Sequence, residues 1–386
     1  MFHFINKFLL VFGFNLYWLM IPSSKYLIIA LFIVYFIFYL KKICFDGFVV
    51  AYSLYILLLI LMSLKNIYYD GESAYFTSSI IWSVVFLPLL FIGSAYLEIH
   101  KISKNFAIIA VFSSVLILLN YFTGSSYIQR LIDVSPDNAG VISFHPREQL
   151  SGLVMSFALL FYCGYSRDRC SFGIIIMFIA CLISFLLIGS FLAMGVGIVA
   201  MVYFFAKRLN LIKLMVYCTL GLYFLWGSIP LYIQLIGANN HDVFSVHQIL
   251  RLTQGSDWML YKLFESNSRL DLLHKAIGML DISVFGVTHG YFLSDDGLSP
   301  HSLLAELIAY SGIFGLILIV IYCFIFMFNY RKLGRDDVFV LFFSFLLSFL
   351  NSNNLALPFV FTFLFIMAYR VRLVNNNPGS FKLSSC

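Results

Sequence analysis

The segment "SPHSLLAELIAYSGIFGLILIVIYCF" (residues 299–324) decides the fold class. It opens on Ser-Pro-His and then runs apolar over a length sufficient to cross a lipid bilayer. Ser299 can cap a helix and Pro300 suits its first position, so His301 is predicted to lie in the first turn. Free backbone N–H groups and the positive end of the helix dipole meet there, and both attract anions. The sequence therefore predicts a membrane helix that begins with a histidine at an anion-attracting end.

The composition extends this interpretation to the whole chain. Its 386 residues are 62% hydrophobic and 11% charged, and the mean hydropathy is +0.95. A soluble domain does not cover its surface with so few charged groups, so the surface is predicted to face lipid. We expect an all-α polytopic membrane protein that forms a single integral membrane domain over 1–386, with about twelve transmembrane helices. The candidate spans lie near 4–21, 27–40, 48–64, 76–97, 105–123, 149–165, 172–188, 190–206, 214–236, 301–328, 338–350 and 355–370.

The basic residues predict the orientation of these spans. With the N-terminus in the cytoplasm, twice as many of the 24 Lys and Arg residues fall on the cytoplasmic side as on the outer side. Both termini are therefore predicted to be cytoplasmic. The net charge of +6 follows from this asymmetry and does not indicate a nucleic-acid partner. Lys7 precedes an apolar stretch that has no small-residue cleavage site, so this stretch is expected to remain as the first span.

Polar residues are concentrated in two outer loops, 124–148 and 237–300. Loops of this length are usually functional or disordered, and the second does not have a disordered composition. It contains "SNSRLDLLHKAIGML" (266–280), which is predicted to form an amphipathic helix with Ser268 as its N-cap. The predicted apolar stripe would lie on the membrane interface or on neighbouring spans, and it consists of Leu270, Leu273, Ile277 and Leu280. Arg269 falls in the first turn of this helix, and the glycine-containing segment "FGVTHGYF" (285–292) follows it.

Few residues inside the predicted spans carry charge, and Glu306 is the only acid clearly within one. Ion-coupled transporters place acids or bases near the bilayer midplane, so this distribution disfavours a transporter. Arg269 has the planar, permanently charged group that binds a phosphate bidentately, or it extends to lipid headgroups. Arg147, in "FHPREQLSGL", is a second candidate for anion binding, or it anchors the sixth span beside Glu148. His301 can donate a hydrogen bond to a phosphate or transfer a proton, unless it is only solvated at the interface.

Other polar residues are interpreted as solvated loop positions: His145, His274, His289, Arg251, Asp295 and Asp296. The seven cysteines lie in spans or at cytoplasmic ends without metal-ligand spacing, so neither a disulfide nor a zinc site is predicted. No P-loop, GxGxxG, HExxH or GxSxG pattern occurs in the sequence, so nucleotide chemistry is not indicated.

An arginine-bearing amphipathic helix in a large outer loop, a glycine-containing exit and then "HSLLAELIAYSGIFG" (301–315) resemble the O-antigen polymerase and ligase superfamily. Its members commonly carry a His-Asn pair, several apolar residues and a Gly-x-x-Gly motif at the start of the span after the large periplasmic loop. The resemblance covers about 266–316, and the twelve-span layout with cytoplasmic termini also fits. By this resemblance, Arg269 corresponds to the loop arginine of the family and His301 to its histidine.

Two departures from the family pattern bear on the choice of branch. Ser302 stands where the family usually has asparagine, which is a tolerable polar exchange. The hairpin "LIGSFLAMGVG" (187–197) lacks the arginine that ligases typically place there. This difference favours a Wzy-type polymerase over a ligase, and Arg147 would then supply the missing positive charge.

The resemblance implies metal-independent glycosyl transfer on the periplasmic side of the bacterial inner membrane, within lipopolysaccharide biosynthesis. The substrate would be an undecaprenyl-diphosphate-linked oligosaccharide, with polyprenyl diphosphate as the leaving group. Arg269, Arg147 and His301 would bind the diphosphate, and His301 or Glu306 would deprotonate or orient the acceptor hydroxyl. No cofactor is implied. The expected partners are the lipid-linked oligosaccharide, membrane lipid and a chain-length regulator protein.

The same residues are compatible with two alternatives. An O-antigen ligase, which transfers glycan to lipid A–core, would share the pattern of Arg269 and His301. A lipid-linked sugar flippase or secondary transporter would share the number of spans.

Overall fold

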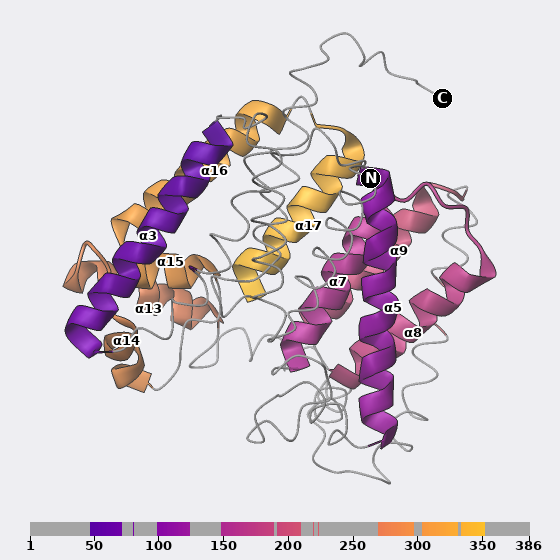
Figure 1. Ribbon diagram of the computed structural model, residues 1–386, viewed down its shortest axis with the longest axis horizontal. Coiled ribbons are helices and arrows are strands. Elements are labelled where there is room, and N and C mark those ends of the chain that lie inside the picture. Colours follow the sequence, from indigo (N-terminus) through magenta and orange to yellow (C-terminus); the bar gives the residue numbers. More distant parts are fainter. Residues whose placement is uncertain are drawn as a thin grey trace, which may run out of the picture. The chain divides into compact units, whose positions relative to one another are not determined.

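The computed structural model describes residues 47–71, 80, 99–123, 148–188, 191–209, 219, 223, 269–296, 303–330 and 333–351. All regular elements within these residues are helices, which confirms the predicted all-α class. The helices form two compact units, which Figure 1 draws in colours that follow the sequence. The remaining candidate spans, near 4–21, 27–40, 76–97, 214–236 and 355–370, lie outside the described residues except for Ile80, Thr219 and Tyr223.

Unit 1 joins one early helix to the later part of the chain. Its helices are α3 (Gly47–Asp70), α13 (Arg269–Ile282), α14 (His289–Asp296), α15 (Leu303–Ser311), α16 (Ile313–Tyr330) and α17 (Arg335–Asn351). Helices α3 and α16 lie side by side in Figure 1, and α14 and α15 also contact α3. Helices α13 and α17 pack against α15. The short helix α15 is therefore the common neighbour of most of the unit.

Helix α3 is apolar on both of its faces. The buried face includes Tyr52, Tyr55, Leu59 and Met62, and the exposed face includes Val50, Leu54, Leu57, Leu61 and Leu64. Among the described helices it alone is long and apolar enough to cross a membrane, over Val49–Asp70 with 22 residues and a mean hydropathy of 1.8. Shorter apolar stretches of helix are Ser103–Leu119, Gly152–Tyr165, Phe172–Phe185, Ala193–Ala206 and Ile313–Ile325.

Unit 2 is built around α7. It comprises α5 (Ile99–Thr123), α7 (Glu148–Tyr165), α8 (Phe172–Ile188) and α9 (Phe191–Ala206), and α7 contacts the other three. Residues 152–166 are all buried, so this helix is surrounded by protein on every side. The predicted division of the apolar run near 188–190 is confirmed, because α8 ends at Ile188 and α9 begins at Phe191.

Serines and aromatic rings hold the helices of unit 2 together. The hydroxyl of Ser156 donates to the carbonyl of Ala193, and the hydroxyls of Ser114 and Ser184 lie 2.8 Å apart. The rings of Phe106 on α5 and Phe161 on α7 are stacked, with centroids 4.7 Å apart. Hydrogen bonds between small polar residues are a common source of specificity where both the helices and their surroundings are apolar.

The tenth candidate span is not continuous, and the expectation of one helix over 301–328 was wrong. Helix α15 ends at Ser311 and α16 begins at Ile313, with Gly312 between them at a φ of 59°. The segment before α14 docks on this break. The N–H of Ile313 donates to the carbonyl of Val284 at 2.9 Å, and the N–H of Val287 donates to the carbonyl of Ala309 at 2.8 Å. These bonds replace some of the intrahelical hydrogen bonds that are lost at the break.

The docking depends on two glycines, Gly286 and Gly312. A Cβ atom on Gly312 would lie 2.1 Å from the carbonyl oxygen of Val284, and one on Gly286 would lie 2.6 Å from the backbone of Tyr310. Gly286 has a φ of 76°, so both glycines adopt the left-handed region that other residues avoid. The apolar pattern of 301–328 cannot reveal such a break, because the residues on both sides of it are equally apolar.

Helix α13 forms as predicted from its spacing, but a different face of it packs on the unit. The buried residues are Leu272, Ala276 and Met279, whereas Ile277 of the predicted stripe is 48% exposed. The buried set has the same three- and four-residue spacing as the predicted one, so periodicity alone did not separate the two.

We predict that Gly312→Ala destabilises unit 1, by about 2–3 kcal/mol, because it strains the backbone and separates the docked segments. The measurement is the midpoint of thermal unfolding of the purified chain. Gly278→Ala is the matched control, since a Cβ at this exposed position of α13 meets nothing within 4 Å. An alanine at position 312 that leaves the midpoint at the control value would contradict the docking described here.

Candidate functional site

The polar end of α3 caps the start of α14. The backbone N–H groups at residues 289–291 lie in the first turn of α14, where a helix offers no partner of its own. Asn66 accepts the first of them at 3.1 Å, Asp70 the second at 2.9 Å and the hydroxyl of Thr288 the third at 3.2 Å. Thr288 also donates its hydroxyl to Asp70 at 2.9 Å. The negative charge of Asp70 thus lies at the positive end of α14, which fixes this helix on α3.

Lys65 connects the same end of α3 to the helix break. Its ammonium donates to the carbonyl oxygen of Tyr310 at 2.6 Å and to that of Phe285 at 3.2 Å. Carbonyl groups in the last turn of a helix lack intrahelical partners, and Tyr310 lies in the last turn of α15. The ammonium group of Lys65 therefore binds both backbone segments that meet at the break.

His289 and Tyr310 form a pair between α14 and α15. Nδ1 of His289 and the hydroxyl of Tyr310 lie 2.9 Å apart, and the two rings meet edge to face with centroids 5.6 Å apart. The ring of Tyr310 is buried and also contacts Phe292 edge to face, whereas His289 is half-buried. The contact orients the ring, and imidazole is a side chain that can act as a proton donor or acceptor.

These contacts define one cluster, which we name the polar junction: Lys65, Asn66, Asp70, Thr288, His289 and Tyr310. Its members come from the end of α3, the start of α14 and the end of α15. Capping accounts for Asn66, Asp70 and Thr288 without any ligand. The histidine is therefore the member of the junction best suited to proton transfer.

The structure describes the residues predicted from the sequence to different extents. Glu306 lies in the first turn of α15 and is fully buried. Arg269 is the first residue of α13, and its side chain lies outside the description. Because α13 packs against α15, the helix that begins with Arg269 contacts the helix that contains Glu306. His301 and Arg147 lie outside the described residues.

The polar residues that were interpreted as solvated loop positions differ in where the structure places them. His289 is not a solvated loop residue, because it begins α14 and contacts Tyr310. His274 is exposed on α13, in agreement with its interpretation as a solvated residue. Asp295 and Asp296 end α14, and His145 and Arg251 lie outside the described residues.

Sequence reasoning missed most of the polar junction. A threonine before a helix is a recognisable N-cap signal, and it was present at Thr288. The carboxyl and amide groups at the end of α3 gave no comparable signal, because the helix that they cap lies more than 200 positions later in the chain. No protein-family model, curated protein or solved structure matches this chain.

We predict that Asp70→Ala lowers the stability of unit 1 by about 1–2 kcal/mol, since it leaves the N–H of Gly290 and the hydroxyl of Thr288 without their acceptor. The midpoint of thermal unfolding is again the measurement. Asp281→Ala is the matched control, because Asp281 is exposed at the end of α13 in the same unit. Equal midpoints for the two variants would show that the capping contact contributes nothing.

Proposed function

We propose that this chain is an O-antigen polymerase of the bacterial inner membrane. In this proposal about twelve spans cross the bilayer, both termini are cytoplasmic and the reaction takes place on the periplasmic side. The enzyme joins undecaprenyl-diphosphate-linked oligosaccharide repeat units, and it requires neither a metal nor a cofactor.

Exposed apolar side chains support the membrane placement. In addition to α3, helix α16 exposes Ile313, Phe314, Ile317, Val320 and Phe324, and α5 exposes Ile108, Val111, Phe112, Val115 and Leu119. Such stripes along whole helices exceed the isolated apolar residues that a soluble surface tolerates. Lipid acyl chains around these helices would cover the exposed apolar side chains.

The polar junction carries the proposal for the site. Alternation of the predicted loops puts the end of α3 and the large loop (237–300) on the same outer side, and the junction joins these two regions through the hydrogen bond between Thr288 and Asp70. The backbone contact between the glycine-containing exit (285–292) and the break at Gly312 lies in the same unit, so two separate segments of the stretch that resembles the family meet there. A periplasmic site at this end of unit 1 is consistent with both observations.

The proposed reaction is a single displacement of diphosphate. The sugar hydroxyl of one lipid-linked unit attacks the anomeric carbon of the growing chain, and the bond from that carbon to the diphosphate oxygen breaks. The hydroxyl proton passes to a base, and the polyprenyl diphosphate departs as an anion. Arg269, Arg147 and the helix start at His301 would stabilise the charge that develops on the leaving group.

Burial separates the two candidate bases. Glu306 is enclosed within unit 1, where a substrate hydroxyl does not reach it without rearrangement. His301 lies two positions before Leu303, the first residue of α15, and is the better choice for the base. Glu306 then contributes to the packing of α15, and its role in the reaction is indirect.

We predict that Arg269→Ala and His301→Ala abolish chain extension while the protein still accumulates in the membrane, and that Arg147→Ala does similar damage. The measurement is the ladder of lipopolysaccharide chain lengths in a deletion strain that expresses each variant. Glu306→Gln preserves the shape of the side chain and is expected to retain the ladder.

The deletion strain itself separates polymerase from ligase. Lipid A–core that carries a single repeat unit supports the polymerase, whereas bare core with unattached polymer would contradict it. Near-normal ladders from both Arg269→Ala and His301→Ala would remove these residues from the proposed site.

We also predict that His289→Ala reduces chain extension, measured from the ladder, at least tenfold more than His274→Ala does. Losses of this size are typical when a proton-transfer or orienting group is removed. Both variants remove one imidazole from unit 1, but His289 lies in the polar junction and His274 is exposed on α13. Equal ladders from the two variants, at equal protein abundance, would limit His289 to a structural role.

A further inference from the structure

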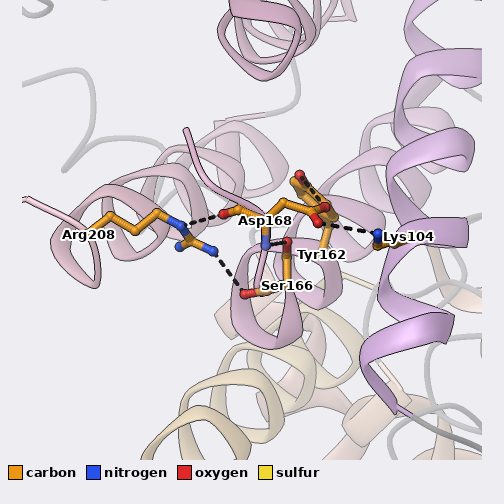
Figure 2. Close-up of polar contacts among 5 residues, drawn as sticks. All are labelled: Lys104, Tyr162, Ser166, Asp168 and Arg208. Carbon is orange, nitrogen blue, oxygen red and sulfur yellow. Dashed lines mark hydrogen bonds and ion pairs between the residues drawn. The ribbon is translucent and has the colours of Figure 1, made fainter. Parts of the chain in front are cut away.

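One end of unit 2 carries a dense group of basic residues, and Arg208 holds the backbone there. Its guanidinium donates to the carbonyl oxygens of Asp168 at 2.8 Å, Ser166 at 2.9 Å and Phe204 at 2.8 Å. Figure 2 shows this cation on one side of Asp168 and Lys104 on the other. Arg208 also stacks on the ring of Phe204, with 3.6 Å from its Cζ atom to the centroid. It therefore fixes the connection between α7 and α8 to the end of α9.

The remaining cations of this end are turned to the surface. Lys104 is 67% exposed and lies 3.4 Å from the carboxylate of Asp168. Arg167 and Arg169 are exposed, and no partner is found for either among the described residues. Lys207 donates to the carbonyl of Gly164 at 2.8 Å and is also exposed. We name Lys104, Arg167, Arg169, Lys207 and Arg208 the basic end of unit 2.

The acids in unit 2 do not balance this charge. Within the described ranges 99–123, 148–188 and 191–209, the acidic residues are Asp168 and Glu148. Asp168 already bonds to Tyr162 and pairs with Lys104, and Glu148 begins α7 whereas the basic end lies at its other terminus. The basic end thus keeps a net positive charge that nothing in the described part of unit 2 neutralises.

The apolar face of α8 begins directly beside the basic end. Phe172 is 78% exposed at the first residue of α8, and the exposed face continues through Ile175, Ile176, Ile179 and Ile183. Arg169 and this apolar face are separated by only Cys170 and Ser171. Cations at the edge of an apolar surface match the boundary between phospholipid headgroups and acyl chains.

We infer that the basic end of unit 2 binds the phosphate groups of anionic phospholipids at the cytoplasmic leaflet. The exposed guanidinium groups of Arg167 and Arg169 have the fork geometry that matches phosphate oxygens, and Lys104 and Lys207 add charge beside them. The acyl chains lie along the exposed face of α8. This inference rests on the proposed membrane placement and is independent of the proposed reaction.

The test compares two fluorescent lipid probes, phosphatidylglycerol and phosphatidylcholine, on the purified full-length chain in non-ionic detergent. Fluorescence anisotropy measures the affinity for each probe. The native chain is expected to prefer phosphatidylglycerol. The variant Arg167→Gln/Arg169→Gln should bind it more weakly by roughly fivefold per cation removed, and this difference should shrink at high salt.

The matched control is Lys25→Gln/Lys262→Gln, which removes the same charge from segments that the sequence places on the outer side. It should retain the preference for phosphatidylglycerol. The midpoint of thermal unfolding without added lipid checks that each variant is folded. If the double arginine variant does not fold, the two single arginine variants replace it in the test.

Three outcomes would overturn the inference. The first is that the native chain binds the two probes with equal affinity. The second is that the double arginine variant binds phosphatidylglycerol as tightly as the native chain does. The third is that inorganic phosphate displaces the probe as effectively as unlabelled phosphatidylglycerol does. A chain that stays soluble without detergent would instead refute the membrane placement, and the proposed function with it. A chain that needs detergent but shows no lipid preference would refute this inference alone.

Discussion

Unit 1 depends on a backbone contact that only glycine permits. At Gly312 the chain turns from α15 into α16 with a positive φ, and Gly286 lets the segment before α14 approach the same point. Gly315 lets α16 approach α15 closely, because a Cβ there would lie 2.4 Å from the carbonyl oxygen of Leu307. With any larger residue at Gly286 or Gly312, the two segments would have to separate. The Gly-x-x-Gly pattern of the tenth span is thus explained by packing.

A helix that breaks among apolar residues needs substitutes for its lost hydrogen bonds, since buried backbone groups are rarely left unpaired. Here the substitutes come from protein: two backbone bonds from the docked segment and the ammonium of Lys65. The same docking brings Thr288 and His289 to the end of α3, where Asn66 and Asp70 cap α14. One constraint on the backbone therefore explains both the break and the assembly of the polar junction. In the proposed function, this constraint also sets the position of the large outer loop (237–300), which carries Arg269.

The sequence was sufficient for the features that depend on local composition. Hydropathy predicted the all-α class and the approximate bounds of α3, α5, α7, α8, α9 and α17, and Ile188-Gly189-Ser190 correctly marked the division between α8 and α9. Features that depend on contacts between distant segments were not predictable. The break at Gly312 lies within uniformly apolar sequence, and the buried face of α13 has the same spacing as the stripe that was predicted. The polar junction needs α3 and α14 to meet, which no local pattern encodes.

In the proposed function, the chain lengthens a lipid-linked glycan at the periplasmic end of its tenth span. The most direct measurement uses the purified chain in liposomes with undecaprenyl-diphosphate-linked repeat units, and quantifies both glycan length and free undecaprenyl diphosphate. We predict that longer glycans accumulate together with one released diphosphate carrier for each unit added. Movement of the lipid-linked substrate across the bilayer without any lengthening, or lengthening without release of the carrier, would contradict it.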